Sequence, residues 1–272
     1  AMGCLASMVR TDARIQAHMP RVISFEEACT LPILWNTIRL ALGECMPPGA
    51  RHRVLIHATT GGVGLVALEF THRIGAVASG SVGRPSKVAH LLGLGVALVA
   101  SSRDASTFVR GAASCLAGWR LYGTLSALTK AFIPTALIMM NDGSCYLEVG
   151  KNNIWSEARV AAAVACSPFC LVAADFQSAE WTLERLTELT ERVRVGEVHP
   201  LPLTAFHFEK GDMVRAFNEL RRGDHVGRYV ATVAGNAARS DASVAHLAWL
   251  PSSLDGFMLA IGASEQRQSP FK

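Results

Sequence analysis

The stretch that decides the fold is Val54-Leu55-Ile56-His57-Ala58-Thr59-Thr60-Gly61-Gly62-Val63-Gly64-Leu65-Val66-Ala67. Its apolar start is typical of a buried parallel strand, and an apolar segment with helical periodicity follows the glycines. A turn at the N-terminus of a helix offers backbone N–H groups and the positive end of a dipole to a phosphate. The residues of this turn that we expect to contact the diphosphate of a dinucleotide are Thr60, Gly61, Gly62, Val63 and Gly64.

The glycine spacing in this turn is Gly61-x-x-Gly64-x-x-Ala67, which falls short of the full three-glycine dinucleotide fingerprint. Glycine leaves room for a diphosphate to approach the backbone, and Ala67 lets the helix pack closely on the sheet. The same pattern also suits a tight strand-to-helix turn that binds nothing. His57, the last residue of the predicted strand before this turn, is expected to fill the strand and not to take part in chemistry.

The end of the second predicted strand indicates which cofactor the turn would hold. No Asp or Glu lies between Glu69 and Asp104, where a NAD-binding protein carries an acid for the ribose hydroxyls. Instead this region offers groups that suit a 2′-phosphate through charge-assisted hydrogen bonds, namely Ser81, Gly83, Arg84 and Lys87. The sequence therefore predicts NADPH. The alternative is that the two cations simply belong to a solvated first helical turn, although cations there oppose the helix dipole.

Strand and helix patterns alternate through the first two thirds of the chain. The expected strands are 52–57, 76–80, 97–100, 120–125 and 144–149, and the expected helices are 63–73, 85–92, 105–114, 131–140 and 157–165. This alternation predicts an α/β fold with a Rossmann-type, doubly wound parallel sheet.

The regions on either side of this alternation have their own patterns. A helix is expected over 25–42, where Ser24 and Glu27 have the spacing of a capping box. Beyond residue 175 we expect helices at 178–194 and 212–222 and strands at 201–208 and 228–233, which suit remnants of a second, β-rich domain.

Composition excludes several classes of function. Half of the 272 residues are hydrophobic, so the chain can build a substantial core. The net charge of +4 gives no basic stripe for nucleic acid, and no apolar run reaches the ~18 residues that would suggest a membrane span. The seven cysteines are scattered, which predicts reduced thiols in a cytoplasmic protein, and Cys166 and Cys170 have the spacing of one helix face.

Several segments together resemble the enoyl reductase domains of modular polyketide synthases and animal-type fatty acid synthases, which are zinc-free members of the medium-chain dehydrogenase/reductase superfamily. The resemblance runs from about residue 10 to residue 234, in the same order as in the family. The segments that carry it are Glu26–Pro32, Val54–Leu65, Ser101–Asp104, Phe132–Pro134, Leu147–Lys151, Ile154–Ser156, Leu201–Leu203 and His225–Arg228.

The resemblance implies an NADPH-dependent oxidoreductase that reduces the α,β double bond of an enoyl thioester on an acyl carrier protein. Neighbouring synthase domains would be its partners, a homodimer is compatible with it, and it implies no bound metal. Lys151 and Asp175 match a lysine–aspartate pair discussed as catalytic in the family; a structural ion pair, or a lysine on the adenosine or diphosphate side, is the alternative. Further cofactor contacts are expected from Ser126, Val149, Gly150 and Arg228.

The resemblance also implies a division of the chain. Residues 1–35 would be a remnant of the substrate domain with its connecting helix, and 36–199 the NADPH-binding domain. Residues 200–234 would be the return segment of the substrate domain, and 235–272 a linker or docking tail. We expect a member truncated at the N-terminus, because only the last stretch of the family's first barrel is recognisable.

Residues 120–128 depart from the family because they lack its usual Asp and Asn. This loss leaves a second hypothesis open: a catalytically inactive, reductase-like structural module of a synthase. A stand-alone quinone oxidoreductase is a third hypothesis, which the segment Lys151-Asn152-Asn153-Ile154-Trp155 disfavours because it looks more like the synthase domains.

Overall fold

The computed structural model describes residues 11–116, 120–164, 168–208, 210–233 and 257–258. Backbone contacts group the chain into two units. Unit 1 comprises the described residues of 1–33, 178–218 and 229–272, and unit 2 comprises those of 34–177 and 219–228. The division suggested by the sequence instead placed 178–199 with the nucleotide-binding domain and 219–228 with the return segment.

Unit 2 is built on a six-stranded sheet in which every strand pair is parallel. Its strands, in the spatial order β4-β3-β2-β5-β6-β7, are Leu98–Ser101, Val77–Val82, Arg53–Ile56, Leu121–Ser126, Met140–Glu148 and Phe169–Leu171. The strand order reverses between β2 and β5, and ligands of such sheets bind at this reversal, outside the carboxyl ends of the strands. The Rossmann-type sheet expected from the sequence is confirmed, with β7 as an additional strand.

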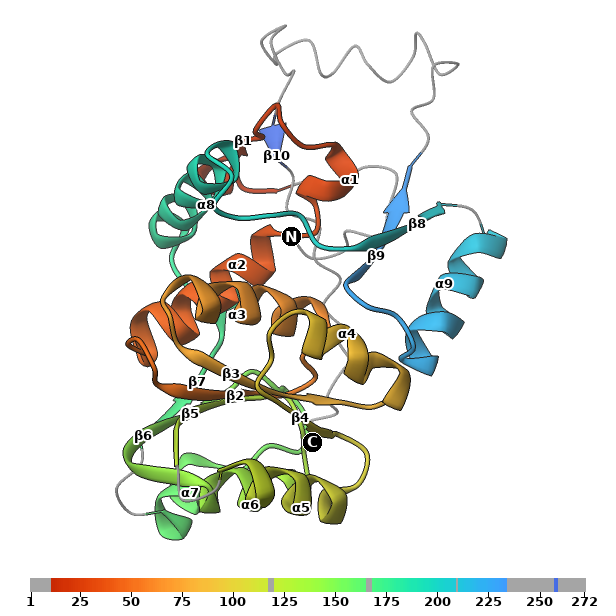
Figure 1. Ribbon diagram of the computed structural model, residues 1–272. Helices are drawn as coiled ribbons and strands as arrows, with labels where there is room; N and C mark the ends of the chain where they lie inside the picture. Colours follow the sequence, from red (N-terminus) through yellow and green to blue (C-terminus); the bar gives the residue numbers. More distant parts are fainter. Residues whose placement is uncertain (1–10, 117–119, 165–167, 209, 234–256, 259–272) are drawn as a thin grey trace, which may run out of the picture. The chain divides into compact units, whose positions relative to one another are not determined.

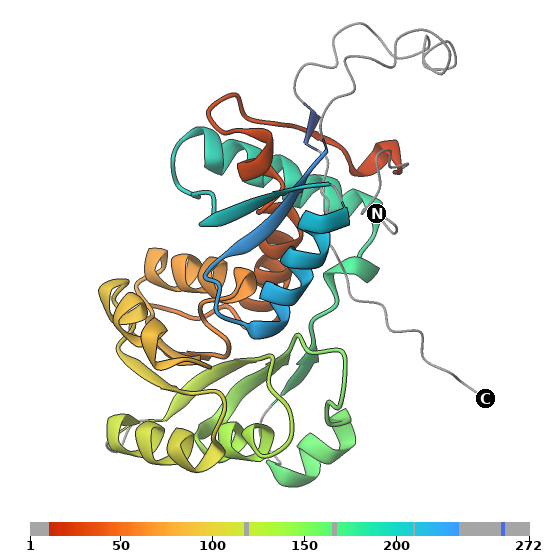
Figure 2. The ribbon, with the colours of Figure 1, turned by 90° about the vertical axis from the view of Figure 1, so that its right-hand side faces the viewer.

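Helices cover both faces of this sheet, because parallel strands need crossover connections. On one face lie α2, α3 and α4, and on the other lie α5, α6 and α7 (Figures 1 and 2). Their bounds are Pro32–Ile38, Gly62–Arg73, Val88–Gly93, Ala105–Leu116, Phe132–Ile138 and Glu157–Ala163. The short 3₁₀ helices η3 (Pro85–Lys87) and η4 (Ala174–Phe176) lie in the connections.

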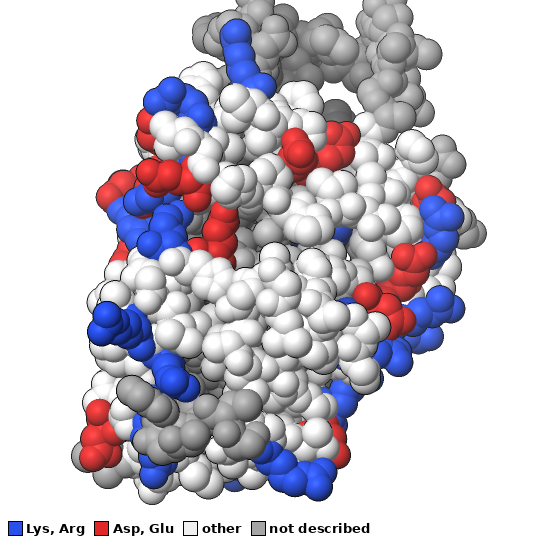
Figure 3. Space-filling model, viewed as in Figure 1, with Lys and Arg blue, Asp and Glu red and all other residues white. Residues whose placement is uncertain are grey.

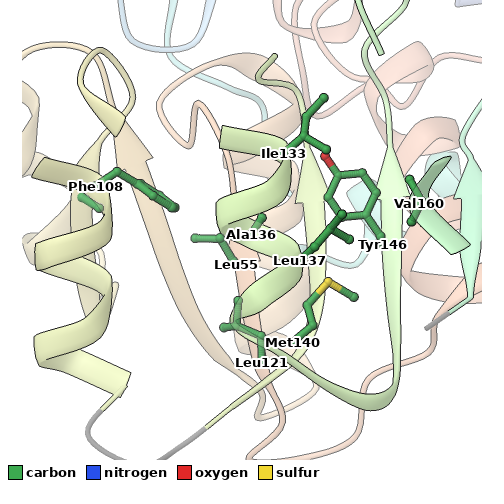
Figure 4. Packing of buried hydrophobic residues seen from close by; sticks show 10 residues of the cluster. Leu55, Phe108, Leu121, Ile133, Ala136, Leu137, Met140, Tyr146 and Val160 are labelled. Atoms are coloured by element: carbon green, nitrogen blue, oxygen red, sulfur yellow. The ribbon is translucent and has the colours of Figure 1, made fainter. Parts of the chain in front are cut away.

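The core beneath α5, α6 and α7 is continuous and mostly apolar. Leu55 of β2 and Tyr146 of β6 pack there against Phe108, Ile133 and other helix residues, as Figure 4 shows. Phe108 and Phe132 meet edge to face with ring centroids 5.6 Å apart, an arrangement that aromatic quadrupoles favour. Burial on both faces explains the apolar strand sequences from which the fold was predicted.

The helix expected over 25–42 is interrupted, and this expectation was wrong. The structure has α1 (Phe25–Ala28), then α2, then the π-helical segment η2 (Arg39–Cys45). The break has a local cause, since Pro32 starts α2 and a proline disfavours helical geometry at the residue before it. The capping box is confirmed: the Ser24 hydroxyl accepts from the Glu27 N–H (3.2 Å), and the Glu27 carboxylate accepts from the Ser24 N–H (2.8 Å).

The expectation that all cysteines are reduced thiols is also corrected. Cys45, at the end of η2, forms a disulfide with Cys170 of β7, and their Cα atoms are 6.6 Å apart. The two residues are 125 positions apart, so no local spacing could indicate the pairing. Cys170 therefore lies on a strand and not on a helix, and Cys166 lies outside the described residues.

Unit 1 contains the remaining elements: η1 (Ala13–Ile15), β1 (Ala17–His18), α8 (Ala179–Arg194), β8 (Leu203–His207), β10 (Phe257–Met258), β9 (Arg228–Thr232) apart from its first residue, and the first part of α9 (Lys210–Arg222). Strand β1 pairs antiparallel with β10, and β8 pairs with β9. The Thr190 hydroxyl of α8 donates to the His18 carbonyl (2.9 Å), which ties α8 to β1. Apart from β10, the predicted tail 235–272 lies outside the described residues.

The described surface agrees with the modest net charge. On the face shown in Figure 3, acidic and basic side chains are intermixed along the two sides and the middle is largely uncharged, so the described residues there form no continuous basic stripe. Among the residues that the structure describes, no helix combines the length and the apolarity that crossing a membrane requires.

Gly64 should be intolerant of any side chain. A Cβ atom there would lie 2.5 Å from the Thr59 Cα and 2.6 Å from the Thr59 carbonyl oxygen, and Thr59 is itself fully buried and hydrogen-bonded to both β2 and β3. We expect Gly64→Ala to lower the free energy of unfolding by roughly 1–3 kcal/mol in urea denaturation. Gly111→Ala in α5 is the control, because its Cβ would meet only Ala100 at 3.9 Å, and helix propensity predicts a gain of up to ~1 kcal/mol. Equal effects of the two substitutions would contradict the assigned close approach.

Candidate functional site

The glycine-rich turn links the carboxyl end of β2 to the first turn of α3. Gly61 is the N-cap of α3 and has no side chain to occupy the first N–H groups of the helix. Thr59 is fully buried; its hydroxyl donates to the Ile56 carbonyl (2.7 Å) and accepts from the Ser81 N–H (2.9 Å). These bonds fix the turn against both β2 and β3, so the start of α3 is held in the position that suits a phosphate.

A distant segment lies beside the same turn. The Gly227 N–H donates to the Thr60 carbonyl (2.9 Å), and Gly227 forms a parallel bridge with Gly61. The Arg228 side chain lies against Gly62, where an added Cβ atom would be 2.7 Å from its Cδ. The structure therefore brings the predicted cofactor residue Arg228 to the glycine-rich turn, although 167 positions separate it from Gly61 in the sequence.

The residues predicted for the 2′-phosphate gather near the end of β3, but they already have protein partners. The Ser81 hydroxyl is buried and accepts from the Ala58 N–H (3.2 Å). Arg84 pairs with Asp224 (2.7 Å). The Lys87 ammonium donates to the carbonyls of the 223–225 turn, at 2.7 and 2.6 Å.

Lys87 is only 8% exposed, so these carbonyl bonds compensate for the burial of a cation. Burial lowers the pKa of Lys87, and the nearby Asp224 carboxylate opposes that shift. The alternative hypothesis, that Lys87 simply belongs to a solvated first helical turn, therefore does not describe this buried lysine. Its contact with a phosphate stays a prediction.

At the ends of β5 and β6 the structure shows two buried groups that sequence reasoning missed, Tyr146 and Glu148. The Tyr146 hydroxyl donates to the Ser126 hydroxyl (2.7 Å) and lies 3.3 Å from a Glu148 carboxyl oxygen. The other carboxyl oxygen of Glu148 accepts from the Gly150 N–H (2.7 Å). Glu148 thus holds the turn that leads from Val149 into Lys151.

Burial controls the charge of Glu148, which is 1% exposed. Desolvation raises its pKa to about 7, and the hydrogen bonds from Gly150, Tyr146 and Ser126 only partly offset this. The signal in the sequence was the single acid in the mostly apolar segment Cys145-Tyr146-Leu147-Glu148-Val149 at the end of β6.

Lys151 and Asp175 do meet, through a 2.5 Å contact between the ammonium and one carboxylate oxygen. Burial acts to raise the pKa of Asp175, but the hydrogen bond from Lys151, a backbone hydrogen bond and the charge of Lys151 together lower the pKa below its ordinary value. Strand β7 ends at Leu171, and Asp175 lies in the short helix η4 that follows it. Both side chains are about half exposed, so the pair adds little stability and is open to a ligand.

His57 is buried beside this edge and stays neutral. Burial lowers its pKa to about 3, and its ring meets Phe108 edge to face. Neither ring nitrogen has a hydrogen-bond partner among the described residues. This placement agrees with the expectation that His57 fills the strand.

Comparison with known proteins identifies relatives of this chain. No family model matches the chain. The chain is 31% identical over 236 residues to erythronolide synthase EryA2 of Saccharopolyspora erythraea, covering 85% of this chain and 6% of that protein. It is 27% identical over 266 residues to the highly reducing polyketide synthase claI of Penicillium crustosum, covering 94% of this chain and 11% of that protein. The chain thus spans only a small part of the curated relatives that it matches.

Solved structures give the same result at the level of a domain. CurK enoyl reductase superposes with a TM-score of 0.75 at 26% identity, covering 82% of this chain and 67% of that chain. JamJ enoyl reductase in its apo form superposes with a TM-score of 0.72 at 27% identity, and the match covers 78% of this chain and 63% of that chain. An Escherichia coli quinone oxidoreductase complexed with NADPH superposes with a TM-score of 0.69 at 18% identity, and the match covers 79% of this chain and 67% of that chain. At this identity the similarity concerns the fold alone.

The parallel sheet with its glycine-rich turn defines a Rossmann-type member of the medium-chain dehydrogenase/reductase superfamily. Within that superfamily, the chain is similar in sequence to polyketide synthases and in structure to their enoyl reductase domains. The family resemblance inferred from the sequence is confirmed.

The buried acid Glu148 should make stability depend on pH. Its pKa is raised from 4.5 to about 7 in the folded chain, so its stabilising protonated state is complete below pH ~4.5 and is lost as the pH rises through about 7. Glu148→Gln cannot ionise, and we expect it to remove this loss of stability between pH ~5 and ~8 in urea unfolding. Glu157→Gln, which removes an exposed carboxylate, should keep the wild-type slope. If the free energy of unfolding of Glu148→Gln changed with pH as steeply as that of the wild type, Glu148 could not be the buried acid that is protonated near neutral pH.

Proposed function

We propose that this chain is an NADPH-dependent reductase of the α,β double bond of an enoyl thioester carried on an acyl carrier protein. The observation that carries the proposal is that the start of α3, the cations near β3 and the Lys151–Asp175 pair all follow the carboxyl ends of strands in the one parallel sheet of unit 2. Kinship with enoyl reductase domains supports the reaction class.

The residues present fit a phosphorylated dinucleotide. The N–H groups at the start of α3, which no side chain caps, suit the diphosphate, and the cations Arg84, Lys87 and Arg103 suit the 2′-phosphate, although Asp224 pairs with Arg84. Val149 and Gly150, which continue from β6, would border the nicotinamide. When bound, NADPH supplies the hydride that the β-carbon of the substrate accepts.

The protein's own contribution is to the proton and to the developing negative charge. Lys151 would place its ammonium near the thioester, where it can stabilise enolate charge and give a proton to the α-carbon. Asp175 orients that ammonium through the 2.5 Å contact. Glu148 fixes the turn before Lys151 through the Gly150 N–H, so the donor is carried by an ordered backbone.

Assembly with neighbouring synthase domains, a homodimeric state and a cytoplasmic location belong to the same proposal. The small share of the polyketide synthase relatives that the chain covers supports the neighbouring domains.

The alternative is a reductase-like structural module without turnover. It is favoured by the engagement of Arg84 with Asp224 and of Lys87 with backbone carbonyls, since these cations are then less available to a cofactor. Titration with NADPH and NADH separates the two functions, because a structural module needs to bind neither cofactor.

Lys151→Met tests the catalytic assignment. We expect NADPH binding to persist, while the rate of crotonyl-thioester reduction, followed by loss of NADPH absorbance, falls by roughly 10²–10⁴-fold, the usual contribution of a general acid. Arg51→Met is the control, since Arg51 is an exposed cation of the same unit that precedes β2, at the opposite ends of the strands. If both variants keep the wild-type rate, Lys151 is only structural. If the wild type binds neither cofactor, the structural module is the better account.

A further inference from the structure

Three cations converge near the end of β3, and we call Arg84, Lys87 and Arg103 the basic cluster. Arg103 reaches this place because its Nε lies 3.0 Å from the position that a Cβ atom on Gly83 would take. Its guanidinium also lies 3.6 Å from the corresponding position on Gly223. The basic cluster is therefore bordered by Gly83 on one side and by the segment that follows α9 on the other.

The segment after α9 is held firmly against the basic cluster. Helix α9 ends at Arg222, and Gly223 adopts the left-handed conformation (φ +68°) that terminates helices. Lys87 then donates to the carbonyls on both sides of Asp224, those of Gly223 and His225. Lys87 is thus a buried anchor for this turn, and releasing it would leave a buried ammonium without its bonds.

Asp224 sits at the tip of the anchored turn, and its carboxylate contacts Arg84 at 2.7 Å. Arg84 and Asp224 are about half exposed, so this contact can open at little cost. A carboxylate and a phosphate use the same guanidinium donors, and two anions held by one cation repel each other. A bound 2′-phosphate would therefore have to displace Asp224 or tolerate it nearby.

We propose that Asp224 is a specificity-determining residue, an internal counter-anion that competes with the 2′-phosphate for Arg84 and so weakens the preference for NADPH over NADH. The inference rests on the proposed function and refines it. It also divides the labour among the cations: Lys87 anchors the turn, whereas Arg84 and Arg103 are the side chains available to the phosphate.

The test is to titrate the full chain with NADPH and with NADH by calorimetry, comparing the wild type with Asp224→Asn. We expect the Kd for NADPH to fall roughly three- to tenfold in the variant and the Kd for NADH to change little, because only NADPH carries the competing phosphate. Asp142→Asn removes the same charge from an exposed position at the start of β6, at the opposite edge of the sheet. It should leave both values unchanged, which excludes an effect of net charge alone.

A double-mutant cycle with Arg84→Gln identifies the cation involved. In the Arg84→Gln background, Asp224→Asn should no longer improve NADPH binding, because the shared cation is gone. An equal gain for both cofactors, or a gain that persists without Arg84, would overturn the inference.

The two proposals fail in different ways. If the wild type binds both cofactors and Asp224→Asn leaves their ratio unchanged, the inference falls and the proposed function stands. If neither cofactor binds to the wild type or to Asp224→Asn, both fall. Unfolding curves of each variant establish that the turn has kept its fold.

Discussion

The constraint on which unit 2 depends is that all of its strands run in the same direction. Parallel strands cannot be joined by short hairpins, so each connection must cross the sheet and leave a helix on one face. All carboxyl ends then meet at one edge. Thr59 stabilises this arrangement at the glycine-rich turn, because its hydroxyl donates to the Ile56 carbonyl at the end of β2 and accepts from the Ser81 N–H of β3. The start of α3, the basic cluster and the Lys151 turn are neighbours because of this geometry.

The elements predicted from the sequence succeeded where the signal is local. Strands buried on both faces need apolar runs, and helices need a 3.6-residue period, so the alternation from residue 52 to residue 165 located the sheet closely. The continuous helix over 25–42 failed because Pro32 divides it, a local signal that its apolar pattern concealed. The Cys45–Cys170 pair joins residues 125 positions apart and leaves no local signal.

The candidate site divides in the same way. Glycines and cations near two predicted strand ends were visible in the sequence, and so was Lys151. The state of Glu148 was not, because it depends on Ser126 of β5 and Tyr146 of β6, which only strand register brings together. The partners of Lys87 lie 136 and 138 positions away. No periodicity indicates that a buried lysine will bind a turn at such a distance, or that a carboxylate will face an arginine there.

The two outer strands of the six-stranded sheet have a further consequence. β4 has four residues and β7 has three, so each edge exposes only a short row of unpaired backbone groups. Long unpaired edge strands are sites where strands of other chains can pair and aggregation can begin. Short edge strands offer few backbone groups for such pairing. Another chain could gain only a few ladder hydrogen bonds at either edge. Association of unit 2 with other polypeptides should therefore use its helical faces and loops, and not extension of the sheet.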